Sequence, residues 1–177
     1  GTNEETSNCF ARFLQQNINK PLVIDADGLN IIANNKNLLE KLPSNSIVTP
    51  HPKEFDRLTH SHTTGYERII SQQKFSKLHN CIVVLKGRNT SISLPCGTIY
   101  FNSSGNSGMA TGGSGDVLTG IILSLLSQGY SPKNAAIYGV YIHGLAGDCA
   151  LQHETVETLT AHNIIEYISD AFRLIHS

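Results

Sequence analysis

The residues with the clearest chemical potential lie in one glycine-rich stretch, NSSGNSGMATGGSGD (Asn102–Asp116), which holds five of the chain's 15 glycines. A strongly apolar run follows at once and predicts a helix over Gly115–Gln128. The N-terminus of a helix has unpaired amide groups and a partial positive charge, and both attract an anion. Glycine at Gly112, Gly113 and Gly115 lets the backbone adopt positive φ and approach a ligand closely. The stretch therefore predicts a phosphate-binding turn, suited best to a polyphosphate.

Asp116 follows this turn directly, although a carboxylate is repelled by the anion that the turn attracts. The arrangement makes sense if Asp116 accepts a proton from a substrate hydroxyl or holds that hydroxyl in place. A structural alternative stays open, in which the stretch is a flexible turn capped by Ser114 and Asp116 only favours the helix dipole. The stretch has neither the G-K-[ST] ending of a Walker A motif nor a GxGxxG pattern after a strand.

Three short apolar runs predict buried parallel strands, and polar residues follow each of them. In open α/β sheets, ligands bind beyond the carboxyl ends of such strands. The strand runs are PLVID, SIVTP and CIVVLKG, and the polar residues after them are Asp25, Asp27 and Asn30, then His51 and Glu54, then Lys86. Structural alternatives remain for each set: Asp27 as a helix cap, His51 and Glu54 as a helix-start pair, and Lys86 as a solvated turn residue.

The remaining pattern predicts an α/β fold of strand–helix units, a hairpin and then helices. The predicted hairpin joins Thr90–Leu94 to Thr98–Phe101. The predicted helices cover Thr6–Asn17, Gly28–Asn35, Asn37–Leu42, Glu54–His60, Tyr66–Asn80, Gly115–Gln128, Lys133–Leu151 and about His162–Ile175. In the helix after the glycines, one apolar stripe consists of Val117, Leu118, Ile121, Ile122, Leu125 and Leu126.

Composition places the 177-residue chain among soluble globular proteins, with 40% hydrophobic and 15% charged residues. A formal net charge of −1 suggests neither nucleic acid nor a membrane as partner. Four scattered cysteines indicate a reduced, cytoplasmic protein, with Cys81 and Cys149 as buried free thiols. His143 is expected to be a core histidine with satisfied hydrogen bonds. The other histidines lack the spacing of a zinc site.

These stretches together resemble a known family. NSGMATGGSGDVLTGII is similar to the signature of ribokinase-like proteins, whose G-x-G-D turn forms an anion hole beside an aspartate base. More narrowly, it resembles the ADP-dependent NAD(P)H-hydrate dehydratases. Four other stretches agree in order, PLVIDADGLNII, IVTPHPKEFDRL, VVLKGRNTSIS and AAIYGVYIHGLAGDCA, so that the resemblance runs from residue 1 to about Asp148. It implies repair of nicotinamide cofactors hydrated on the reduced ring, with nucleotide cleavage as the driving force.

The resemblance also implies a role for each candidate residue. Asp116 is the implied base and also contacts the substrate. Asn106 and His51 are further substrate contacts, and His51 stands where sugar-kinase relatives carry asparagine. Glu54 supports a metal through water. The residues of DADGLN themselves, two carboxylates and an amide at a strand end, are suited to ordering Mg²⁺ or water near phosphates, and Asp27 and Asn30 are therefore second-tier site residues. The implied nucleotide-binding residues are Lys86, Gly87, Arg88, Asn89, Thr90, Gly112, Gly113 and Gly115.

For the whole protein, the resemblance implies a three-layer sandwich with a mostly parallel sheet, of which residues 1–177 are the C-terminal portion of one ribokinase-like domain. The implied substrate is (6S)-NADHX or NADPHX, with ADP, or alternatively ATP, and Mg²⁺. A homo-oligomer (a tetramer) and a fused or separate NAD(P)HX epimerase are implied as partners. A small-molecule kinase for a hydroxymethylpyrimidine or a sugar is the alternative function, and a non-catalytic nucleotide-binding module is a second one. We expect the isolated piece to be poorly soluble or inactive, because it exposes sheet edge and core.

Overall fold

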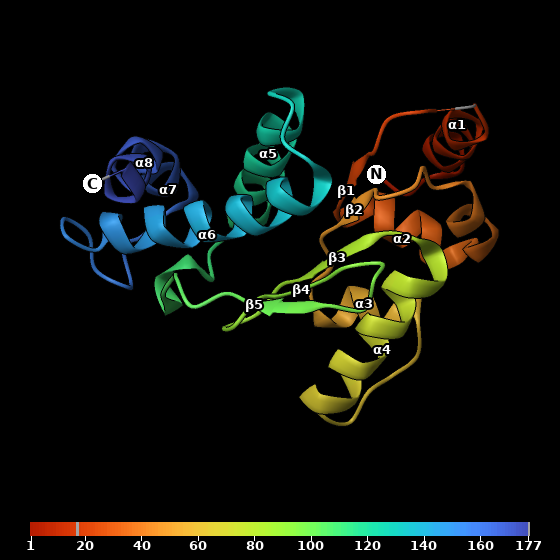
Figure 1. Ribbon diagram of the computed structural model, residues 1–177, viewed down its shortest axis with the longest axis horizontal. Coiled ribbons are helices and arrows are strands. Elements are labelled where there is room, and N and C mark those ends of the chain that lie inside the picture. Colours follow the sequence, from red (N-terminus) through yellow and green to blue (C-terminus); the bar gives the residue numbers. More distant parts are fainter. Residues whose placement is uncertain (17, 177) are drawn as a thin grey trace. The chain divides into compact units, whose positions relative to one another are not determined.

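The computed structural model describes residues 1–16 and 18–176. Contacts divide the chain into two units (Figure 1). The first consists of residues 1–87 and 91–100, and the second of Arg88–Thr90 and the described residues from Phe101 onward. The first unit carries nearly all of the β-sheet, whereas the second is mainly helical. The predicted site residues are therefore divided into two groups, one in each unit.

The five-stranded sheet has the order β1-β2-β3-β4-β5, in which β1 pairs parallel with β2 and β2 with β3. β3 pairs antiparallel with β4. The predicted hairpin is confirmed, since the N–H of Leu94 donates to the carbonyl of Thr98 at 2.9 Å. β3 is buried along its whole length, as its continuous apolar run predicts. The strands are β1 (Val23–Ile24), β2 (Ile47–Val48), β3 (Ile82–Leu85), β4 (Ser91–Ser93) and β5 (Ile99–Phe101).

Four α-helices and one 3-10 helix complete the first unit, and their apolar faces form its core with the strands. The first helix begins and ends two residues earlier than the sequence predicts, because Asn3 caps it by accepting from the N–H of Thr6. Asn17, the last residue predicted for it, lies outside the described residues. The elements are α1 (Glu4–Gln15), α2 (Ala26–Asn34), η1 (Lys36–Lys41), α3 (Pro52–Leu58) and α4 (Gly65–His79).

α4 packs on β3 and β4 through polar as well as apolar contacts. The side chain of Gln72 is fully buried, and its amide donates at 3.0 Å to the carbonyls of Val83 and Ser91. The hydroxyl of Ser91 donates to the Gln72 side-chain carbonyl at 2.7 Å. A buried amide is stable in a core when its donors and acceptors are satisfied, so these bonds define how α4 lies on the sheet.

An ion-pair cluster links α3 to α4. Arg68 binds both carboxylate oxygens of Asp56, at 2.9 and 3.0 Å, and the Nδ1 atom of the buried His62 side chain lies 2.7 Å from the same carboxylate. These hydrogen bonds lower the pKa of Asp56 from its ordinary 3.8 to about 2, and the bond from Arg68 has the largest effect. The cluster therefore favours the charged carboxylate in the folded protein.

This lowered pKa predicts a loss of stability in acid. The stabilisation from Asp56 should be complete above the pKa of 3.8 in the unfolded chain and should disappear as the pH falls toward about 2. We expect it to amount to about 1–2 kcal/mol, because partial exposure weakens the pair. Urea unfolding at several pH values measures it, with Asp56→Asn as the comparison. A variant as sensitive as the original chain over this interval would contradict the assignment.

The second unit is mainly helical, with α5 packed on α6 and α6 on α8. The predicted stripe on α5 is confirmed at Leu118, Ile121, Ile122 and Leu125, which are all buried. The prediction of one helix over 162–175 is wrong, since two helices meet at Tyr167, whose ring stacks on His153. The elements are η2 (Ser107–Met109), α5 (Ser114–Ser127), α6 (Pro132–Ala150), α7 (Ala161–Glu166) and α8 (Ile168–His176).

All four cysteines are free thiols, and Cys81 and Cys149 are buried, as predicted. Burial raises the pKa of the Cys81 thiol to about 12, so it is an inert core residue. Over the described part of the chain, none of the helices has the length and apolar character needed to cross a membrane.

Candidate functional site

The carboxyl ends of the three parallel strands bring one group of predicted site residues together. Lys86, after β3, donates its backbone N–H to the carbonyl of Pro50, after β2, at 2.9 Å. Its ammonium binds the carboxylate of Asp25, after β1, at 2.8 and 3.0 Å. The ends of β1, β2 and β3 are thus tied together at the edge where open α/β sheets bind ligands.

Asp25, and not Asp27, caps α2. The Asp25 side chain accepts from the N–H of Ala26 at 2.8 Å, which corrects the alternative that assigned the cap to Asp27. Asp27 lies in the first turn of α2, and its side chain is half exposed. Asn30 lies one turn further along α2, half-buried. The chain order of two acids beside a helix start does not reveal which one caps, because that depends on the backbone dihedral angles.

His51 is the N-cap of α3 and forms a capping box with Glu54. The Nδ1 atom of His51 accepts from the N–H groups of Lys53 and Glu54 at 3.1 and 3.2 Å. Glu54 in turn accepts from the N–H of His51 at 2.7 Å. Because Nδ1 accepts, the proton of the neutral ring is on Nε2. His51 therefore presents an N–H donor on a side chain that is 44% exposed.

This cap gives a prediction with two variants. His51→Ala should lower the free energy of unfolding by about 1 kcal/mol, whereas His51→Asn should lose less than about 0.5 kcal/mol, because asparagine is a strong N-cap. Urea unfolding of both variants measures the difference. Equal losses in the two variants would show that capping is not the structural role of His51.

Glu54, the residue expected to support a metal, is buried, and both of its oxygens face His51. Mg²⁺ requires an octahedral set of oxygen ligands and usually keeps several waters. Within residues 1–16 and 18–176, no three His, Cys, Asp or Glu side chains gather as a metal-binding group. The described residues therefore form no Mg²⁺ cage of their own, and the predicted contact of Glu54 with a metal through water stays a prediction.

The glycine-rich turn leads into α5 in the second unit. Gly113 is the N-cap, in the left-handed conformation at φ 86°, and no described side chain caps the helix. Gly112 and Gly113 are exposed and Ser114 is buried as the first helical residue, so the alternative of a Ser114 cap is wrong. Gly115 lies in the first turn, and positive φ is found at Gly113 but not at Gly112 or Gly115. An exposed, uncapped helix N-terminus is the geometry that favours an anion, and phosphate binding at this turn stays a prediction.

α6 holds the turn in place through side chains. The Nε2 atom of His143 lies 2.9 Å from the carbonyl of Ser114, in agreement with the expected satisfied histidine, although His143 is only half-buried. Asp148 accepts from the N–H of Gly105 at 2.8 Å and from the side-chain amide of Asn106 at 2.9 Å. Asn106 also accepts from the N–H of Gly108, so its side chain shapes the loop. The loop is thus anchored at both ends.

Sequence reasoning missed the loop-anchoring role of Asp148. A signal was available, because Asp148 is the single acidic residue of the long, mostly apolar segment Lys133–Leu151. An acidic side chain that is partly buried on such a helix requires hydrogen-bond partners.

The segment predicted to bind the nucleotide begins beside Asp25 and continues into the solvent. Lys86 is half-buried, whereas Gly87, Arg88 and Asn89 are exposed. The carbonyl of Thr90 accepts from the N–H of Asn102 at 2.9 Å. The exposed residues are accessible to a ligand, and the two ends of the segment are held by the protein.

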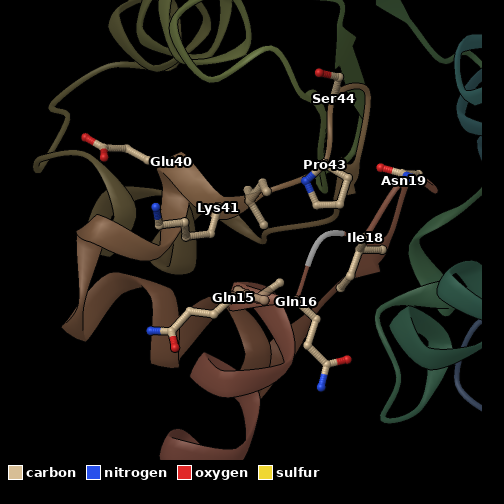
Figure 2. A pocket seen from close by; sticks show the side chains of 10 residues that line it. Gln15, Gln16, Ile18, Asn19, Glu40, Lys41, Pro43 and Ser44 are labelled. Carbon is tan, nitrogen blue, oxygen red and sulfur yellow. The ribbon is translucent and has the colours of Figure 1, made fainter.

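Two hollows lie on the units. One of about 760 Å³ lies between the end of α1 and the connection from η1 to β2, and Figure 2 shows the side chains that line it, none of them a predicted site residue. The other, about 500 Å³, is an apolar cleft between α5 and helices α7 and α8. Asp116 lies at this cleft, exposed in the first turn of α5.

The order of the strands, the strand-end residues and the glycine-capped helix beside an aspartate define a ribokinase-like α/β protein. In agreement, the structure aligns with Arabidopsis thaliana ribokinase complexed with ribose and ATP at a TM-score of 0.59, with 16% identity over 92% of this chain and 52% of that one. This likeness concerns the fold alone. The family model described as NAD(P)H-hydrate dehydratase matches residues 1–170, and the chain belongs to this family.

Individual relatives agree with this assignment. The ADP-dependent (S)-NAD(P)H-hydrate dehydratase of Neisseria meningitidis is 42% identical over 84% of this chain and 51% of its own length. The bifunctional NAD(P)H-hydrate repair enzyme Nnr of Moorella thermoacetica is 39% identical over 86% of this chain and 29% of its own. The Bacillus subtilis ADP/ATP-dependent NAD(P)H-hydrate dehydratase co-crystallised with ATP/Mg²⁺ aligns at a TM-score of 0.83, with 28% identity over 98% and 61% of the two chains. The chain thus spans about half or less of the length of these curated relatives.

Proposed function

We propose that this chain is the nucleotide-binding portion of an ADP-dependent dehydratase that converts (6S)-NADHX or NADPHX to NADH or NADPH. The observation that carries the proposal is the exposed N-terminus of α5, where Gly113 is the cap and Asp116 occupies the first turn. Such a terminus attracts a diphosphate, and a carboxylate beside it is suited to act on a hydroxyl. Membership of the NAD(P)H-hydrate dehydratase family supports the choice of substrate.

In this proposal, ADP lies along Lys86–Thr90 with its phosphates at Gly112, Gly113 and Gly115. Asp116 takes the proton of the hydroxyl on the hydrated ring as that oxygen attacks the β-phosphorus of ADP, and AMP leaves. Loss of the new phosphate ester as inorganic phosphate, with loss of a ring proton, then restores the double bond. The sum is hydrated cofactor plus ADP giving reduced cofactor, AMP and phosphate.

His51 orients the substrate ring in this scheme through its Nε2–H, because the capping box occupies Nδ1 as an acceptor. The His51 side chain is 44% exposed, and its Nε2 lies 3.5 Å from Oε1 of Glu54. Since the described residues form no Mg²⁺ cage of their own, Mg²⁺ would arrive bound to the nucleotide, with Glu54 in contact through water, and would neutralise charge on the phosphates. ATP as an alternative donor and a tetrameric, cytoplasmic enzyme that works beside an NAD(P)HX epimerase belong to the same proposal.

We also propose that residues 1–177 form the C-terminal portion of one ribokinase-like domain. The partial coverage of relatives supports this, because the chain accounts for 51% of the Neisseria meningitidis enzyme. Activity should therefore be measured both in the 177-residue chain and in the longest polypeptide that its gene encodes. A soluble, sharply melting and fully active 177-residue chain would contradict the division.

The test of the activity is recovery of the reduced-nicotinamide absorbance from acid-hydrated NADH on addition of ADP and Mg²⁺. We expect recovery of the S-epimer, with one AMP and one phosphate formed for each NADH. The kinase alternative predicts instead that ATP phosphorylates a hydroxymethylpyrimidine or a sugar, with no NADH formed. Binding of ADP without either reaction would indicate a nucleotide-binding module and would contradict the enzyme.

A further inference from the structure

The ion pair between Asp25 and Lys86 joins two strand ends that are separated by 61 residues in the chain. It is well protected from solvent, since 9% of the Asp25 side chain and 22% of the Lys86 side chain are exposed. Both carboxylate oxygens lie within hydrogen-bond distance of the ammonium, at 2.8 and 3.0 Å. An ammonium has three N–H donors, so at least one remains after two contacts with the carboxylate.

The ion pair contributes little net stability to the fold, because the cost of removing both charges from water offsets much of their attraction. Its surroundings are also strained. Ala26, which follows Asp25, adopts a left-handed conformation at φ 47° without being glycine or asparagine. Backbone outliers of this kind are concentrated at functional sites, where the surroundings hold them in place. Both features lie at the ligand-binding edge of the parallel strands.

A lysine is a flexible point charge that loses much side-chain freedom when a phosphate immobilises it. The pair with Asp25 and the bond from the Lys86 N–H to the carbonyl of Pro50 hold the lysine before any ligand arrives. The side chain of Lys86 therefore has little conformational freedom left to lose when a nucleotide binds to it. This preorganisation increases affinity without adding a contact.

We propose that Asp25 is a positioning residue, which acts through Lys86 to hold its ammonium ready for a phosphate oxygen of the nucleoside diphosphate. The inference rests on the proposed function, since it takes Lys86 as a nucleotide-binding residue. Asp25 itself does not touch the nucleotide. Its carboxylate instead fixes Lys86 and compensates part of the lysine's charge.

The test is a double-mutant cycle in the longest polypeptide that carries this chain, with ADP·Mg²⁺ as the probe and titration calorimetry as the readout. The variants are Asp25→Asn, Lys86→Gln and the double substitution. We expect Asp25→Asn to weaken ADP about tenfold, to raise KM for ADP by a similar factor and to leave kcat within threefold. In the Lys86→Gln background, Asp25→Asn should change ADP affinity less than twofold, because the residue through which it acts is gone.

Asp56→Asn is the matched control, since it removes another partly buried ion pair of the same unit, one that links α3 to α4. It should lower the melting temperature and leave ADP affinity within twofold. If Asp25→Asn lowers only the melting temperature, or tightens ADP in both backgrounds, the positioning role is wrong. If the unsubstituted protein binds no ADP, the proposed function itself fails, and this outcome is separate from the first two.

Discussion

Asp116→Asn should reduce hydrate turnover by at least about 10²-fold and leave ADP affinity within about twofold. A positioned general base contributes about 10²- to 10⁴-fold, and asparagine cannot accept the proton. The side chain is exposed in the first turn of α5, so little of the protein's packing depends on it. The loss of stability should be below about 1 kcal/mol, the usual effect of one charge at a helix terminus. NADH recovery and ADP titration of the same preparation measure the two effects separately.

Asp170→Asn is the control for this variant, because it removes another carboxylate of the second unit, one whose side chain is 40% exposed and pairs with Arg173 on α8. It should affect neither turnover nor ADP affinity. Turnover of Asp116→Asn at half or more of the original rate would remove Asp116 from the reaction. A large loss of ADP affinity would instead assign Asp116 to nucleotide binding.

Gly144→Ala and Gly120→Ala should change stability in opposite directions, although each places one methyl group on a helix. A Cβ at Gly144 on α6 would lie 2.8 Å from the backbone carbon and oxygen of Ser104, at the start of the loop that α6 anchors. Because backbone cannot move away as a flexible side chain does, we expect a loss of about 1–3 kcal/mol. A Cβ at Gly120 on α5 meets no atom within 4 Å, and alanine there should gain about 0.5–1 kcal/mol.

Urea unfolding of the two variants measures this difference, and ADP titration adds a functional readout. Displacement of Ser104 should also disturb the loop held by Asp148, so Gly144→Ala should weaken ADP as well, whereas Gly120→Ala should not. Stabilisation of both variants would mean that helix propensity outweighs the contact with Ser104. That result would show that the loop does not pack closely on α6.

Much of the secondary structure in both units could be predicted from local pattern. The run Ile82–Leu85 is apolar at every position because β3 is buried along its length, and the stripe of α5 repeats as a helix packed on one face requires. Such patterns involve residues that are close in the chain, so the hydrophobic periodicity of the sequence is enough to predict them. The glycine turn at the start of α5 was predictable for the same reason, since the glycines and the helix start are contiguous in the chain.

The sequence by itself therefore determined the α/β class, the strands with their polar ends, and the glycine turn with Asp116. It did not determine which acid caps α2, why the last helix is divided at Tyr167, or that Asp25 binds Lys86 and Asp148 binds Gly105. These last two contacts join residues 61 and 43 positions apart. Partners at such separations are chosen by the pairing of strands and the packing of helices. Only the tertiary structure decides them, because a buried charge takes whichever donor the fold places beside it.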